Sequence, residues 1–449
     1  MQPYELTVAE SAALIARKKL SPVELMESLL SRSRALEPKL RVWVTLDEGA
    51  AMAAARRAEA AVTGGKKLGP LHGVPFGIKD IFYTKGVRTT MGSPIYADFV
   101  PDHDSAAWAR LKRAGAVGIG KTVTTEFACY DPPPTRNPWN AARTPGGSSS
   151  GSAAGVAAKM FPAALGSQTG GSVVRPAAYC GVVGLKPTYG LISRYGVMGL
   201  APSLDTMGHF TRTVEDAALL LAAMAGYDRR DPASVRRPAE DYMAPFKARR
   251  ARAPRIGVLK GYFSERATQH VRDHTAGIVE RMAGSGAVVE EATVGADFET
   301  LAAGHKVIMG AEVAATHERD YAARPGDYGP KMRALVESGM VIPAASYIQS
   351  LRYRQHFIQV ISETLAKYDA LLTPTTPAPA PGPETTGDGS FQIVWSALGL
   401  PTVTMPSGLD PDGLPLGIQV IAGEFEETKL LSAARWCEAT LGVKMSPPV

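Results

Sequence analysis

Cysteine is scarce in this sequence. The 449 residues include three cysteines, Cys129, Cys180 and Cys437. An odd and scattered set of this kind gives neither a disulfide framework nor the paired spacing of a metal site. We therefore expect no structural disulfide, no bound metal and no cofactor, and a reducing, cytoplasmic location fits the composition best.

Long hydrophobic runs and a strong charge of one sign are also lacking. No uncharged apolar run approaches the roughly 18 residues of a membrane span, and the start, MQPYELTVAES, has no secretory signal. The net charge is +6, and the densest basic cluster, residues 247–255, is interpreted as a solvated linker. We expect neither a membrane nor a nucleic acid as a direct partner.

Helix and strand signals alternate along the chain. They predict helices over 104–114, 149–159 and 427–441, and strands over 117–119, 163–165, 255–259, 370–373, 401–405 and 418–421. Such alternation is typical of an α/β fold. We predict a large mixed, mostly parallel β-sheet core covered by helices on both faces.

The chain is predicted to form a single domain over residues 1–449. Capping signals at Thr7 and Ser21 open an N-terminal helical segment, residues 1–65. Residues 66–228 carry the motifs described below, and residues 229–390 read as a variable, mostly helical region. Residues 391–449 supply the strands and the helix that complete the core.

Two serine–glycine loops and one lysine carry the chemical signal. Ser148 and Ser172 each follow two glycines, 24 residues apart, and Lys79 ends an apolar strand-like run. One lysine and two serines can form a nucleophilic acyl-transfer site that needs no histidine. Glycines before Ser172 let backbone N–H groups converge on one point, which predicts an oxyanion hole from residues 169–172, namely Thr169, Gly170, Gly171 and Ser172.

At these residues the chain resembles the amidase signature family. The likeness extends to GPLHGVPFGIKD (69–80), RAGAVGIGKT (113–122) and CGVVGLKPTYG (180–190), and it covers about residues 7–440. It implies a Ser–Ser–Lys triad of Ser172, Ser148 and Lys79 that cleaves an amide to a carboxylate and ammonia or an amine. It also implies a cis peptide bond before Ser148. The resemblance further implies that the hydroxyl of Ser148 relays a proton between Lys79 and the nucleophile.

Departures from the family pattern concern the substrate. Many members read D-T-G-G-S-I-R at the nucleophile, whereas this chain has Gln168 and places Arg175 three residues after the serine. An arginine there can hold a carboxylate, so we predict Arg175, Gln168 and the backbone at Ala128 as substrate contacts. The alternative is that Arg175 pairs with an internal carboxylate and only braces the loop.

Two other motifs in the chain have competing interpretations. Residues 115–122 match the P-loop pattern, but a helical pattern precedes them and β-branched residues follow, so we interpret Lys121 as structural. Ser149 fits the G-x-S-x-G elbow of α/β-hydrolases, which requires one of the later histidines. That interpretation leaves Lys79 and Ser172 without a role.

The leading functional hypothesis is an amidohydrolase that acts on a small amide, a ureide or a carboxyl-bearing amide. Relatives often dimerise, so a homodimer is expected. One rival, within the family, is the glutaminase subunit of an aminoacyl-tRNA amidotransferase, which has the same triad and needs a partner protein. Another rival, of a different class, is a non-catalytic binding protein on the same fold.

Overall fold

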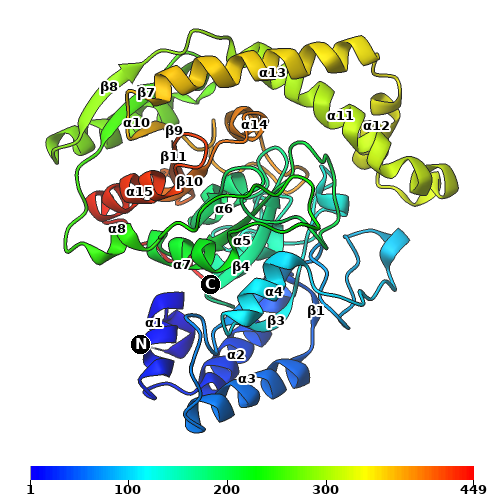
Figure 1. Cartoon of the computed structure of the whole chain (residues 1–449), viewed down its shortest axis with the longest axis vertical. Coiled ribbons are helices and arrows are strands. Elements are labelled where there is room, and N and C mark those ends of the chain that lie inside the picture. Colours follow the sequence, from blue (N-terminus) through cyan, green and yellow to red (C-terminus); the bar gives the residue numbers. More distant parts are fainter. Residues whose placement is uncertain (1) are drawn as a thin grey trace.

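An eleven-stranded sheet runs through residues 2–449, the part of the chain that this computed structural model describes (Figure 1). The strand order is β1-β3-β2-β4-β6-β5-β10-β11-β9-β7-β8. The strands are β1 (Trp43–Leu46), β2 (Pro75–Lys79), β3 (Val117–Thr122), β4 (Ala163–Gln168), β5 (Val183–Lys186), β6 (Thr206–Thr211), β7 (Arg255–Leu259), β8 (Val288–Ala292), β9 (Ala370–Pro374), β10 (Thr402–Leu409) and β11 (Pro415–Ile421).

The mixed sheet of an α/β fold is confirmed, but the expectation that it is mostly parallel is wrong. Within residues 2–449, six of the ten strand pairings are antiparallel. The parallel pairs involve β2 with β3 and β4, and β7 with β8 and β9. Only residues 410–414 join β10 to β11, and a connection of that length cannot form the crossover that a parallel pair needs, so these two strands run antiparallel.

Helices cover both faces of the sheet. Side chains alternate between the faces of a strand, and on β4 Leu165 joins one hydrophobic cluster while Ala164 joins another. The cluster of Leu165 includes α7 (Val214–Met224) and α15 (Glu427–Leu441), and the cluster of Ala164 includes α2 (Pro22–Leu40), α3 (Glu48–Thr63) and α5 (Ser150–Ala157). A third cluster joins α9 (Tyr262–Arg266), α11 (Phe298–Ala323), α13 (Ala344–Leu365) and α14 (Ser390–Ala397) around the stacked rings of Phe263 and Trp395.

The helices follow the expected local signals. Thr7 and Ser21 accept hydrogen bonds at the starts of α1 and α2, as their capping patterns predict. The α-helices are α1 (Val8–Ala16), α2 (Pro22–Leu40), α3 (Glu48–Thr63), α4 (Ala106–Arg113), α5 (Ser150–Ala157), α6 (Val174–Cys180), α7 (Val214–Met224), α8 (Ala244–Lys247), α9 (Tyr262–Arg266), α10 (Gln269–Gly284), α11 (Phe298–Ala323), α12 (Pro330–Met340), α13 (Ala344–Leu365), α14 (Ser390–Ala397) and α15 (Glu427–Leu441).

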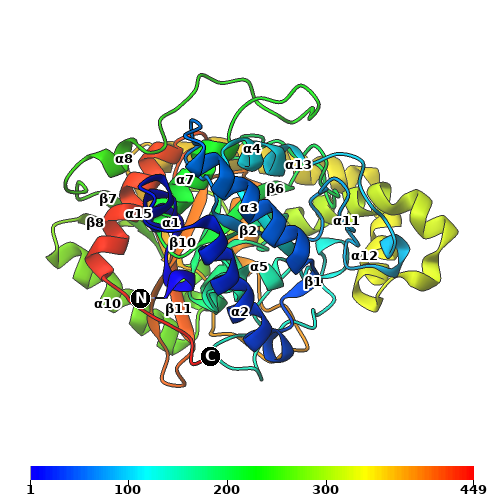
Figure 2. The same cartoon turned by 90° about the horizontal axis from the view of Figure 1, so that it is seen from below.

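The long helices α11 and α13 extend beyond the sheet on the side opposite α1–α3 (Figure 1). The C-terminal residue lies against the N-terminal helices, because Arg32 in α2 donates to the backbone oxygen of Val449 at 2.8 Å, and the view from below shows this tail beside α2 (Figure 2). Across the described residues, no helix is long and apolar enough to cross a membrane.

Candidate active site

Lys79 lies at the end of β2 with no solvent exposure. Its Nζ donates to Ser148 Oγ at 2.7 Å and to Ser167 Oγ at 2.8 Å. Burial lowers the pKa of Lys79 well below its ordinary value, and the negative charge of Asp205 opposes this shift. A buried amine with a lowered pKa can exist in the neutral form, which accepts protons.

Ser148 lies in the loop that leads into α5. Its carbonyl accepts hydrogen bonds from the backbone N–H groups of Thr125 and Ser150, so the residue is fixed from two sides. The Ser150 hydroxyl also donates to the carbonyl of Gly146 at 2.7 Å. The peptide bond between Gly147 and Ser148 is cis, as the family resemblance implies.

Ser172 lies in the turn between β4 and α6, and 8% of its surface is exposed. Across residues 2–449, no protein acceptor pairs with the backbone N–H groups of Thr169, Gly170, Gly171 or Ser172. Buried backbone donors are usually paired, so a row of free N–H groups indicates a place for an external acceptor. A Cβ on Gly171 would lie 3.0 Å from the amide oxygen of Gln392, so this turn has little room for a larger residue.

Gln168, predicted as a substrate contact, does not line the cavity. Its Oε1 accepts from the backbone N–H groups of Val173 and Val174, each at 2.9 Å, and its Nε2 donates to Ser396 Oγ at 3.0 Å. The amide is therefore used inside the protein, where it holds the turn of Ser172 onto the start of α6.

Arg175 is buried, and its guanidinium contacts no carboxylate of residues 2–449. Nη1 donates to the carbonyl of Gly387 at 2.9 Å, and Nη2 donates to the carbonyl of Gly147 at 2.7 Å and to Thr386 Oγ1 at 3.2 Å. Its Nε has no partner among the described residues. The side chain thus braces two loops; burial lowers its pKa and the charge of Asp388 opposes this shift, but no carboxylate of residues 2–449 forms an ion pair with it.

A cavity of about 470 Å³ brings these groups together. Ser148 and Ser172 both line it, and Lys79 lies behind Ser148. Residues 169–171, Arg175 and Ala128 also line it. The opposite wall comes from the region predicted to be variable and includes Tyr262, Arg266, Glu299, Ala302, Lys306, Met309 and Asp388.

Sequence reasoning missed three buried residues beside this site. Ser167 is the second partner of the Lys79 amine. Asp205 accepts a hydrogen bond from Thr169 Oγ1 at 2.5 Å, and His305 Nε2 lies 3.0 Å from the carbonyl of Thr169. Asp205 stands in SLDTMGHF (203–210), a segment that resembles the family, and this segment is the signal that could have found it.

The competing motifs have structural roles. Gly120, Lys121 and Thr122 lie on β3, so the P-loop pattern precedes no helix N-terminus. The amine of Lys121 donates to the carbonyl of Phe82 and to Thr89 Oγ1. Ser149 Oγ donates to a backbone carbonyl, and no histidine of the described residues is hydrogen bonded to it. Nor do these residues contain a cluster of side chains that could hold a metal ion.

Comparison with known proteins decides the family. The family model named Amidase matches residues 24–431. The chain belongs to the amidase signature family. It is accordingly an enzyme of the carbon–nitrogen hydrolase type, and the predicted family and enzyme class are confirmed.

Other members of the amidase signature family match along nearly the whole chain. The glutamyl-tRNA(Gln) amidotransferase A subunit of Halothermothrix orenii is 34% identical over 100% of both chains. The protein of that name from Azoarcus sp. is 37% identical over 95% of this chain and 96% of its own. Among solved structures, the peptide amidase from Stenotrophomonas maltophilia has a TM-score of 0.87 and 30% identity, covering 100% of this chain and 99% of its own.

A further solved structure has a TM-score of 0.91 and 31% identity, and it covers 97% of this chain and 98% of its own. It is described as part of a vestigial protein complex that reveals the evolutionary origins of an s-triazine catabolic enzyme. The relatives therefore include proteins that are named as components of a complex and proteins that are named as amidases.

Proposed function

We propose that this enzyme cleaves the C–N bond of a small amide through an acyl-enzyme on Ser172. The observation that carries the proposal is the buried hydrogen bond from Lys79 to Ser148, which ends at the cavity that Ser172 also lines. A base, a hydroxyl relay and a second hydroxyl in that order are what a serine nucleophile needs for activation.

In the proposed reaction a proton passes to Lys79 through Ser148 and then returns by the same path to the leaving nitrogen. Ser172 Oγ attacks the amide carbon, its proton passes to Ser148, and the proton of Ser148 passes to the neutral amine of Lys79. The C–N bond then breaks as the same proton returns through Ser148 to the leaving nitrogen, so that ammonia or an amine departs. Water hydrolyses the acyl-enzyme by the same relay and releases the carboxylate.

The proposed oxyanion hole consists of backbone N–H groups from Thr169 to Ser172. Their lack of protein acceptors supports this role, because such donors can turn to the negative oxygen of the tetrahedral intermediate without losing an internal bond. Their place on the cavity wall, beside the hydroxyl of Ser172, supports it further.

The position of Arg175 supports the proposal that the substrate is anionic. Arg175 lines the cavity, and no carboxylate among residues 2–449 forms an ion pair with it, although the charge of Asp388, which also lines the cavity, raises its pKa against the effect of burial. We propose that it attracts a carboxylate of the substrate while it braces the loops around Gly147 and Gly387. Replacing Arg175 with lysine should raise KM for anionic amides selectively, and an equal loss on neutral amides of the same size would refute this role.

The biological role has two candidates, and the curated relatives favour the second. One is a stand-alone amidohydrolase for a carboxyl-bearing amide or ureide, acting as a homodimer in the cytoplasm. The other is the glutaminase subunit of an aminoacyl-tRNA amidotransferase, which works with a partner protein. The 34% identity over the whole chain to an amidotransferase component supports the second, and glutamine is itself a small amide with a carboxylate.

Ammonia release from an amide panel tests these proposals. The panel contains glutamine, malonamate-like acids, biuret-like ureides, neutral aliphatic amides and arylamides, with Ser172→Ala protein as the control. Fast release from one class that the variant abolishes supports Ser172 as the nucleophile and names the substrate. Activity on glutamine alone, together with a co-purifying partner protein, supports the amidotransferase role, whereas equal activity of the variant refutes the acyl-enzyme.

A further inference from the structure

Asp205 is a buried carboxylate that the proposed relay does not use. It directly precedes β6, and 6% of its surface is exposed. Oδ1 accepts from Thr169 Oγ1 at 2.5 Å, and Oδ2 accepts from the backbone N–H groups of Leu200 and Ala201 at 2.7 and 3.0 Å. One side chain therefore ties the turn that precedes Ser172 to the loop of residues 200–205.

The contact between Asp205 and Thr169 begins where the sheet ends. In the antiparallel pair of β4 and β6, Gln168 lies opposite Thr206, which is the last pair of the ladder. The next pair in this register is Thr169 with Asp205, and it is joined by side chains instead of the backbone. This hydrogen bond thus extends the rigid sheet by one step, up to the first free N–H group of the turn.

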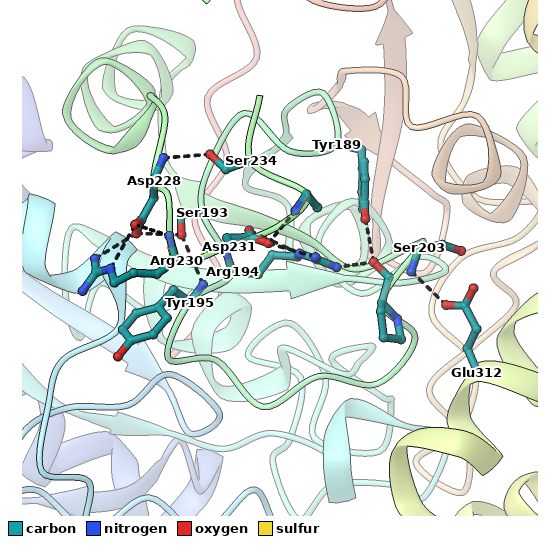
Figure 3. Close-up of polar contacts among 12 residues, drawn as sticks. Tyr189, Ser193, Arg194, Tyr195, Ser203, Asp228, Arg230, Asp231, Ser234 and Glu312 are labelled. Atoms are coloured by element: carbon teal, nitrogen blue, oxygen red, sulfur yellow. Dashed lines mark hydrogen bonds and ion pairs between the residues drawn. The ribbon is translucent and has the colours of Figure 1, made fainter. Parts of the chain in front are cut away.

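The loop that carries Asp205 is itself fixed from outside (Figure 3). The hydroxyl of Tyr189 donates to the carbonyl of Pro202 at 2.7 Å, and the guanidinium of Arg194 donates to the same oxygen. The backbone N–H of Ser203 donates to Glu312 in α11 at 2.8 Å. A carboxylate mounted on such a loop has little freedom to follow Thr169, so it can dictate where Thr169 lies.

We propose that Asp205 is a positioning residue of the reaction, whose carboxylate fixes Thr169 and thereby aims the N–H groups of Thr169 and Gly170 at the oxyanion. The inference rests on the proposed function of the same site. His305 contributes from the other side of the turn, since its Nε2 contacts the carbonyl of Thr169. When the Asp205 contact is lost, the side chain of Thr169 is no longer held at its hydroxyl, and the N–H groups of the turn can shift. Small displacements of catalytic groups lower the reaction rate strongly.

The charge of Asp205 allows a second, independent test of the proposal, the pH dependence of kcat/KM. Burial raises the pKa of Asp205 to about 6, so the group is ionised at neutral pH. The charge of Asp205 affects the pKa values of Lys79, Arg194 and Tyr189. In Lys79 this charge raises the pKa against the effect of burial. Removal of the charge therefore lowers the pKa of Lys79 and moves the acidic limb of kcat/KM to lower pH.

The experiment compares Asp205→Asn, Thr169→Val and Thr169→Ser on the best amide of the panel, with thermal melting as a check of folding. Thr169→Val and Asp205→Asn should each lower kcat by about 10- to 100-fold with KM changed less than about threefold. Thr169→Ser keeps the donor and should recover at least about tenfold of the kcat that Thr169→Val loses. Asp205→Asn alone should shift the acidic limb to lower pH.

Thr211→Val is the matched control, because Thr211 also lies on β6 and its hydroxyl donates to the carbonyl of Thr213, away from the cavity. It should lower the melting temperature without changing kcat. Wild-type kcat in folded Thr169→Val, or equal kcat in Thr169→Ser and Thr169→Val, overturns the proposal. Activity that survives Ser172→Ala refutes the proposed function instead, so the two failures are distinguishable.

Discussion

Replacing Lys79 with methionine tests the base of the proposed relay. Methionine has a similar length and no amine, so the substitution deletes the hydrogen bonds of 2.7 and 2.8 Å to Ser148 and Ser167 with little change of volume. A positioned general base contributes typically about 10²–10⁴-fold to a rate. We expect kcat to fall by at least about 10²-fold and the acidic limb that belongs to Lys79 to disappear.

The same substitution has a modest effect on stability. Two lost hydrogen bonds cost about 2 kcal/mol in total at about 1 kcal/mol each, and removal of a buried amine offsets part of this cost. The pKa of Lys79 is low in the folded chain and ordinary in the unfolded chain. At neutral pH Lys79 therefore binds more protons in the unfolded chain than in the folded chain, and the contribution of Lys79 to stability rises with pH up to about 10.4.

The assay combines ammonia release from pH 5 to 10 with thermal melting at pH 7 and 9.5. The difference in stability between wild type and Lys79→Met should grow at the higher pH. Lys186→Met is the control, because Lys186 is also fully buried and burial lowers its pKa to about 7, but it donates only to the carbonyl of Pro187. It should keep the wild-type kcat. Lys79→Met protein that folds and keeps kcat within about tenfold would refute the relay.

Three further predictions concern the frame of the site. Gln168→Leu removes two hydrogen bonds at the start of α6 and one to Ser396 in α14, and it should lower the free energy of unfolding by about 2–4 kcal/mol; an unchanged denaturation midpoint contradicts this. Gly155→Ala places a Cβ about where the Phe161 ring lies, 2.1 Å away, and should cost about 1–3 kcal/mol in the same experiment, whereas a stabilised variant contradicts the packing. Burial raises the pKa of Cys129 and Cys437 to about 12, so iodoacetamide at pH 8 should leave both thiols unlabelled in the native protein by mass spectrometry, and rapid labelling contradicts the burial.

The sequence predicts the groups proposed to react better than the residues that support them. Lys79, Ser148 and Ser172 stand in short segments whose residue types and spacing suffice to suggest the chemistry, and the structure places them around one cavity. The helix predicted over 427–441 also has those bounds in α15. Local patterns determine both results, because a cap, a glycine turn or an apolar stripe acts over a few residues.

Long-range partners explain what the sequence could not predict. The contact between Thr169 and Asp205 joins residues 36 positions apart, and the contact between Gln168 and Ser396 joins residues 228 positions apart. Neither partner has a local pattern that names the other. The prediction of mostly parallel strands was wrong for a similar reason. Strand β5 pairs with both β6 and the distant β10, and the order of the strands depends on the whole sheet.

The cavity draws its two sides from separate stretches of the chain. The groups proposed to break the bond lie between residues 79 and 175, whereas much of the opposite wall lies on α9, α11 and the segment 386–393. Mutations of wall side chains that do not hold the catalytic turns can therefore alter substrate preference, whereas His305 on α11 contacts the carbonyl of Thr169 and is excluded from this set. A directed-evolution library restricted to the other wall side chains can therefore explore new amides while it leaves Lys79, Ser148 and Ser172 unchanged.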